Sequence, residues 1–160
     1  MYLFLKIALI IALFSLSYQD LRERKVYLSL LIIIGIIMAF FHFKNSDKAA
    51  FLGSVSLNIT IILTIYLILT FYSNWKLKKS IIQTFGFGDV IFFGIIAIGF
   101  STVSFLILFS FSLIFSLLAF IILKPRFSNK TVPLAGLQSI FIALIFVFNW
   151  LFKFTNLYTI

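Results

Sequence analysis

The chain has 160 residues, of which 63% are hydrophobic, 11% are charged and 23 are phenylalanine, and its net charge is +9. A soluble domain of this length does not need so much apolar surface, so the composition excludes an ordinary soluble enzyme and indicates a polytopic membrane protein. Cysteine is absent and His42 is the single histidine, which excludes disulfides, thiolate chemistry and metal sites built from several cysteines or histidines.

Six apolar runs follow one another along the chain, and each is close to the roughly 20 residues that cross a bilayer as a helix. The runs are continuous rather than alternating, so they predict helices and exclude a membrane barrel. The expected spans are residues 3–18, 26–43, 50–72, 81–100, 102–123 and 132–152, the fourth and fifth being nearly fused. We therefore predict an all-α fold with about six transmembrane helices in a single domain over residues 1–160.

The basic residues predict how these spans are oriented. Lysine and arginine collect in cytoplasmic loops, and here nine lie in the first, third and fifth loops whereas four lie on the other side. The nine are Arg22, Arg24, Lys25, Lys76, Lys78, Lys79, Lys124, Arg126 and Lys130, and the four are Lys6, Lys44, Lys48 and Lys153. Both termini are therefore expected outside a cytoplasmic (inner) membrane. The pattern favours topology signals and lipid contacts over nucleic-acid binding.

Residues 1–19 also resemble a secretory signal peptide, with an apolar run and small residues near its end. The basic segment of such a peptide would consist of Lys6 alone. Cleavage would also leave Arg22, Arg24 and Lys25 on the outer face, against the charge rule. We therefore expect the first span to be retained.

The acidic residues are few enough to consider one by one. Asp47 lies in an outer loop among lysines and is expected to be a solvated charge. Asp20 ends the first span, and Asp89 lies about eight residues into the fourth run, so the predicted topology places both on the cytoplasmic side at similar depth. An ionisable residue inside a membrane is by default a candidate functional residue. The structural alternative is that Asp89 caps a helix starting at Val90.

Two glycines, Gly86 and Gly88, precede Asp89. They permit a local break in the helix and the close approach of another backbone, although small residues also favour tight helix packing. Two facing carboxylates can share one proton, so that one acts as general base toward water while the other acts as general acid toward a peptide carbonyl. This hydrolytic chemistry needs no metal, thiol, histidine or cofactor.

Three segments resemble the type IV prepilin peptidases and their archaeal preflagellin relatives, which are six-helix intramembrane aspartyl proteases. They are the Gly-x-Gly-Asp motif at Gly86–Asp89, the segment Asp20–Val26 with its Asp at the end of the first helix, and the Pro-containing approach to the last helix at Lys130–Gly136. The resemblance implies that Asp20 and Asp89 are the catalytic pair and that Gly86, Gly88, Pro133 and Gly136 shape the site. It implies a prepilin-like precursor as substrate, whose short basic leader is removed at the cytoplasmic boundary of the membrane.

The chain also departs from the family pattern. Tyr27 and Leu28 follow Val26 where many members have Pro-Asn, and Ile91 stands where many have a lysine, so these positions bear on substrate details. The bifunctional members carry a cytoplasmic domain with paired Cys-x-x-Cys motifs and also methylate the new N-terminus. This chain has no cysteine, so it resembles a compact, peptidase-only form.

Other polar residues near the motifs have competing interpretations. Glu23 shares a helical face with Asp20 and could replace it in the pair, although a pairing with a neighbouring basic residue is favoured. Gln83 and Thr84 could bind a substrate backbone or cap a helix, and His42 is expected at the outer interface.

Two other classes of function remain open. They are a small ion- or proton-coupled transporter that uses Asp89, and a non-catalytic scaffold of a secretion assembly. A peptidase requires Asp20 and Asp89 to converge within about 3–6 Å.

Overall fold

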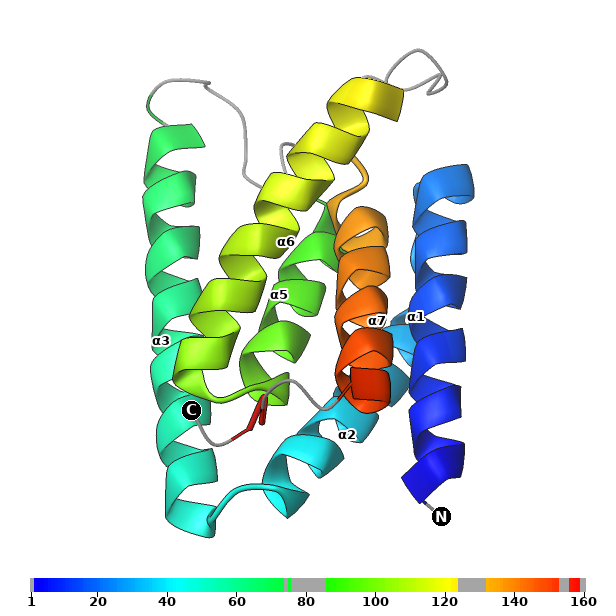
Figure 1. The fold of residues 1–160 in the computed structure, drawn as a ribbon. Coiled ribbons are helices and arrows are strands. Elements are labelled where there is room, and N and C mark those ends of the chain that lie inside the picture. Colours follow the sequence, from blue (N-terminus) through cyan, green and yellow to red (C-terminus); the bar gives the residue numbers. More distant parts are fainter. Residues whose placement is uncertain (1, 74, 76–85, 124–131, 153–155, 159–160) are drawn as a thin grey trace.

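The computed structural model describes residues 2–73, 75, 86–123, 132–152 and 156–158 (Figure 1). Its helices are α1 (Tyr2–Glu23), α2 (Leu28–Lys44), α3 (Lys48–Tyr72), α5 (Phe87–Gly99), α6 (Thr102–Leu123) and α7 (Leu134–Phe152). Helices and short connections make up all of these residues, and none of them forms a strand. The predicted all-α fold is therefore confirmed.

Among the described residues, four helices, α1, α3, α6 and α7, are long and apolar enough to cross a membrane. The other two are shorter, because α2 has 17 residues and α5 has 13. At 1.5 Å per residue these correspond to about 25 and 20 Å, against a hydrocarbon core of about 30 Å. Each predicted span therefore contains a helix, but the boundaries differ. Helix α1 continues to Glu23, and α5 begins at Phe87, with residues 81–85 outside the described part of the chain.

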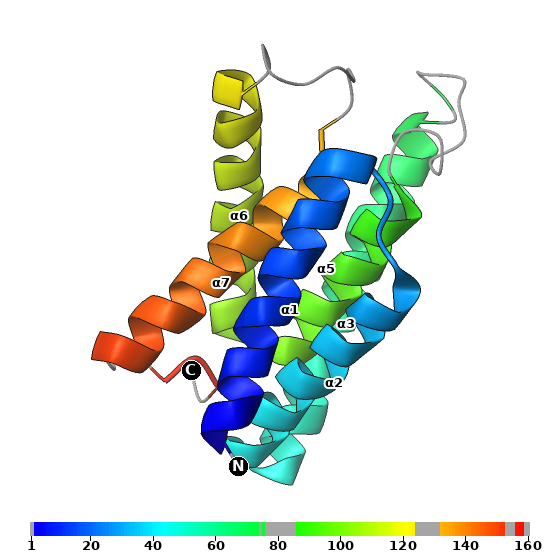
Figure 2. The same cartoon turned by 90° about the vertical axis from the view of Figure 1, so that its right-hand side faces the viewer.

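The helices alternate in direction, so that their ends gather at two opposite ends of the bundle (Figures 1 and 2). One end holds the C-terminus of α1 and the N-termini of α5 and α7, and we call it the aspartate end. The opposite end holds the start of α1, the connection from α2 to α3, and residues 156–158. The interior between them is closely packed, with α1 lying along α7 and α2 along α5. Its largest fully buried side chains are Phe92, Phe100, Phe105 and Phe146.

The short helix α5 lies inside the bundle, and side chains from two other helices cap its C-terminus. The last carbonyl groups of a helix have no partner within it. His42 Nδ1 of α2 donates to the carbonyl oxygen of Ile98 at 2.8 Å. Asn58 Nδ2 of α3 donates to the carbonyl oxygens of Ala97 and Phe100 at 2.8 and 2.9 Å. His42 lies near one end of the bundle and is fully buried, where its ring meets the need of these carbonyls for a donor.

Candidate active site

The first turn of α7 organises the site. Pro133 is buried directly before the helix, and its carbonyl oxygen accepts the N–H of Leu137 at 3.1 Å. The N–H groups of a first turn have no acceptor within their own helix. In α7 two of them are satisfied by carboxylates from other helices. The N–H of Ala135 donates to Asp89 Oδ1 and the N–H of Gly136 donates to Asp20 Oδ2, each at 2.7 Å.

This arrangement brings Asp20 and Asp89 together. Adjacent amide nitrogens in a helix are about 3 Å apart, so the two accepting oxygens are separated by no more than about 8 Å. The carboxylates are near enough for their charges to interact. Both side chains are buried, with 8% of Asp20 and 9% of Asp89 exposed. The partial positive charge at the N-terminus of a helix favours anions at this place.

Asp89 also caps its own helix. Its second oxygen, Oδ2, accepts the N–H of Gly86 at 3.3 Å. The capping interpretation made from the sequence therefore describes part of its role, although the capped helix begins at Phe87 rather than at Val90. By contrast, Oδ1 of Asp20 accepts no hydrogen bond from the residues that the structure describes.

The three glycines predicted to shape the site differ in how much space a side chain would have at each position. Gly86 has φ −64° and ψ 143°, an extended conformation open to any residue, and Gly88 lies within the first turn of α5. A Cβ atom at Gly88 would make ordinary contact with Val26 at 3.5 Å. At Gly136, however, a Cβ atom would lie 2.9 Å from both Cβ and Oδ2 of Asp20. A side chain is therefore excluded where α7 approaches α1, more strictly than in the Gly-x-Gly motif.

A pocket of about 470 Å³ opens beside the two carboxylates. It is lined by Asp20, Arg24, Lys25, Val26, Tyr27, Leu28, Leu31, Gly86, Phe87, Gly88, Asp89 and Ile91. The lining includes all three positions at which the chain departs from the family pattern, and at those positions it is apolar or aromatic. Polar groups thus concentrate at the carboxylates and at two basic residues.

Arg24 also lines the pocket, beside the two carboxylates. It follows the last turn of α1 and has φ 54°, the left-handed conformation, while its N–H donates to the Asp20 carbonyl oxygen at 3.2 Å. Such a conformation costs a non-glycine residue about 1–2 kcal/mol. Its guanidinium interacts electrostatically with both carboxylates. The residue pattern predicted Arg24 first of all as a topology determinant, and it gave no sign of the left-handed backbone conformation.

Not every candidate comes to this site. Glu23 is exposed at the end of α1 and does not line the pocket. Gln83 and Thr84 lie outside the described residues. The role of the Ala135 backbone amide as a donor to Asp89 was not predicted. The available signal was Pro133, which indicates that a helix, with unpaired N–H groups in its first turn, begins nearby. No group of three or more His, Asp or Glu side chains that could hold a metal occurs among the residues described.

No protein-family model, no curated protein and no solved structure matches this chain. The site is therefore characterised by its own geometry. Two buried carboxylates from different helices meet at one helix N-terminus, beside a pocket that is large enough for several side chains of a peptide.

Proposed function

We propose that this protein is an intramembrane aspartyl endopeptidase in which Asp20 and Asp89 form the catalytic pair. The observation that carries the proposal is the convergence of the two buried carboxylates on the consecutive amides of Ala135 and Gly136. Residues 20 and 89 are far apart along the chain, so local structure cannot bring their side chains together. The two side chains meet because α1 and α5 both pack at the start of α7.

The chemistry follows from one proton shared between two carboxyl groups. The ionised group accepts a proton from a water molecule, which attacks the carbonyl carbon of the scissile peptide bond. The protonated group donates its proton to the carbonyl oxygen, and the resulting tetrahedral intermediate breaks down with proton transfer to the leaving amine. The α7 amides hold one oxygen of each carboxylate, and in this proposal the reacting water binds at the other oxygen of Asp20.

The substrate that fits best is a prepilin-like precursor. Its hydrophobic helix would lie in the membrane and its short basic leader in the cytoplasm, so that the peptide bond between them lies at the aspartate end. The apolar lining of the pocket suits extended substrate residues with apolar side chains. In this proposal the aspartate end faces the cytoplasm, both termini face outside, and the protein resides in the inner membrane.

The competing function is a scaffold in which both aspartates serve only as helix caps. Asparagine caps a helix about as well as aspartate does, but it cannot accept the proton of a catalytic water. Asp20→Asn and Asp89→Asn therefore separate the two functions. The packed interior between the two ends of the bundle argues against the third candidate, a transporter, because that function needs Asp89 to be reachable from both sides.

The experiment is a cleavage assay. The protein is co-expressed with a prepilin-like precursor from the same genome, and loss of the leader is followed by mass. Wild type is expected to trim the precursor. Asp20→Asn can keep the bond from Gly136 through its amide oxygen, so it should insert normally, unfold at the wild-type temperature and leave the precursor intact. Asp89→Asn keeps one of its two accepted bonds, so it should also insert and leave the precursor intact, with a somewhat lower unfolding temperature. Cleavage by either variant would remove that aspartate from the catalytic pair. A wild-type chain that trims no candidate precursor would favour the scaffold.

A further inference from the structure

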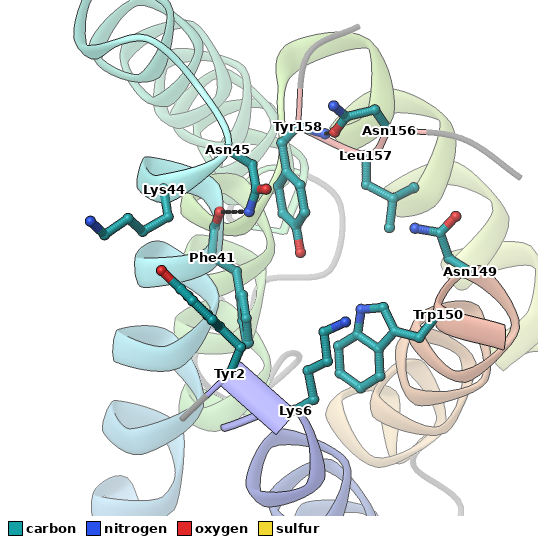
Figure 3. A pocket seen from close by; sticks show the side chains of 10 residues that line it. All are labelled: Tyr2, Lys6, Phe41, Lys44, Asn45, Asn149, Trp150, Asn156, Leu157 and Tyr158. Carbon is teal, nitrogen blue, oxygen red and sulfur yellow. Dashed lines mark hydrogen bonds between the residues drawn. The ribbon is translucent and has the colours of Figure 1, made fainter. Parts of the chain in front are cut away.

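A second pocket, of about 620 Å³, lies at the opposite end of the bundle (Figure 3). Its walls come from the start of α1, the end of α2, the end of α7 and the segment that follows α7. The lining residues are Tyr2, Lys6, Phe41, Lys44, Asn45, Asn149, Trp150, Asn156, Leu157 and Tyr158. The lining contains two lysines, three asparagines, two tyrosines and a tryptophan, but no acidic side chain. The aspartyl chemistry does not use this pocket.

The charge of the pocket is concentrated on one oriented lysine. Lys6 Nζ lies over the ring of Trp150, 5.0 Å from its centroid, and Figure 3 shows the ammonium pointing into the pocket, whereas that of Lys44 points away. Within the described part of the chain, Lys6 has no carboxylate partner. A lysine that lies within a membrane helix and is held by an aromatic ring without a counter-ion is suited to an anion.

A neutral donor lies near this charge. The Tyr158 hydroxyl is directed toward the middle of the pocket in Figure 3. A cation and a hydroxyl donor, with no carboxylate among the described lining residues, match a phosphate group, whose oxygens only accept hydrogen bonds.

The surface beside the pocket indicates which kind of molecule would carry the phosphate group. On the first turn of α1, 70% of Leu3 and 74% of Phe4 is exposed, so an apolar wall leads away from Lys6 along a membrane helix. Trp150 and Tyr2 are also the residue types that concentrate where the bilayer meets water. A lipid combines the two requirements, because its headgroup carries the phosphate and its acyl chains cover apolar side chains.

We infer that this pocket binds the phosphate-containing headgroup of an anionic membrane lipid, with Lys6 as the principal contact. Lys6 supplies the charge, the Tyr158 hydroxyl supplies a hydrogen bond, and the exposed side chains of the first turn of α1 pack against the acyl chains. This site is independent of the proposed peptidase function, because it lies at the other end of the bundle.

The test is native mass spectrometry of the purified chain in detergent with equimolar phosphatidylglycerol and phosphatidylcholine. Wild type is expected to retain one phosphatidylglycerol in preference to phosphatidylcholine. Lys6→Gln is expected to lower that retention about five- to tenfold, as loss of one basic residue near an anionic headgroup predicts. Lys6→Arg keeps the charge and should retain the lipid. The matched control is Lys48→Gln, which removes the same charge from an exposed position at the same end, outside the pocket.

Further arms identify the source of the phosphate and verify folding. Inorganic phosphate is added to lipid-free protein, and the melting temperature is measured. Stabilisation by phosphate without retention of phosphatidylglycerol would overturn the assignment to a lipid. In detergent alone, Lys6→Gln should have the wild-type melting temperature. If its melting temperature is lower, Lys6→Met and Lys6→Arg are compared instead. Loss of the lipid from Lys6→Met together with its retention by Lys6→Arg would then support the inference. Equal retention by wild type and Lys6→Gln would show only non-specific lipid and would refute the inference.

Discussion

Gly136 lies directly against Asp20, so closely that a Cβ atom at position 136 would be 2.9 Å from both Cβ and Oδ2 of the aspartate. The same glycine donates its N–H to that oxygen at 2.7 Å. The contact between α7 and α1 thus depends on a missing side chain at the point where the carboxylate is held. A methyl group there would force Asp20 to move or α7 to withdraw.

Gly136→Ala is therefore expected to lower the rate of precursor cleavage by at least tenfold, since displacing a reacting group by about 1 Å can cost a factor of 100. The rate is measured with the purified protein and a precursor peptide. The control is Gly94→Ala on α5, where a Cβ atom would meet nothing within 4 Å. Wild-type cleavage by Gly136→Ala would mean that the close approach of α7 to Asp20 is not required.

Phe87 is expected to contribute to substrate binding. It lines the pocket beside the carboxylates, yet 67% of it is exposed, so its ring is available to cover a substrate side chain. Phe87→Ala should raise the KM for the precursor about five- to tenfold with little change in kcat, because binding lost equally in the ground and transition states changes KM alone. Phe111→Ala, at an exposed position on α6 outside the pocket, should leave KM unchanged. A fall in kcat instead of a rise in KM would assign the ring to positioning the carboxylates.

Asn58 is expected to hold α3 in the bundle. The buried residues of α3 are Asn58 and Ile62 alone, and the Asn58 amide donates to two carbonyl oxygens at the end of α5. Asn58→Leu removes both hydrogen bonds and should lower the free energy of unfolding in detergent by about 1–2 kcal/mol. Thr60→Val serves as control, because the Thr60 hydroxyl bonds only within its own helix, to the Ser56 carbonyl oxygen. An unchanged melting temperature for Asn58→Leu would show that α3 is held by apolar packing.

The proposed orientation can be read from engineered cysteines, because the chain has none of its own. Tyr27→Cys places a thiol at the aspartate end and Asn45→Cys places one at the opposite end; both positions are exposed and neutral. A membrane-impermeant maleimide should label Asn45→Cys in intact cells and Tyr27→Cys only after the membrane is opened. The reverse pattern would place the aspartates outside and would contradict cleavage on the cytoplasmic side.

The sequence was sufficient to predict the all-α membrane fold and to single out the residues that meet at the aspartate end, for physical reasons that the structure makes clear. Long apolar runs must be helices in lipid, and a carboxylate in such a run needs a partner. The contacts of Asp20 and Asp89 with the first turn of α7 could not be predicted from the sequence. Their donors are backbone amides, and the acceptors come from helices distant along the chain.

The opposite end shows the same limit. His42 was expected at the interface because it ends an apolar run, whereas it is buried against the last turn of α5. The orphan carbonyl of Ile98 becomes visible only when two helices are packed together. Likewise, the steric demand at Gly136 depends on the approach of α7, and it is stronger than that of the more conspicuous Gly86 and Gly88.

The amides that hold the two carboxylates belong to the helix synthesised last of those described. Gly136 follows Asp20 by 116 residues and Ala135 follows Asp89 by 46. The two carboxylates therefore cannot form these hydrogen bonds until α7 has been synthesised and has packed into the bundle. In the proposed peptidase, this order of synthesis delays assembly of the site. A nascent or truncated chain lacking α7 would carry both aspartates without the two amides that hold them.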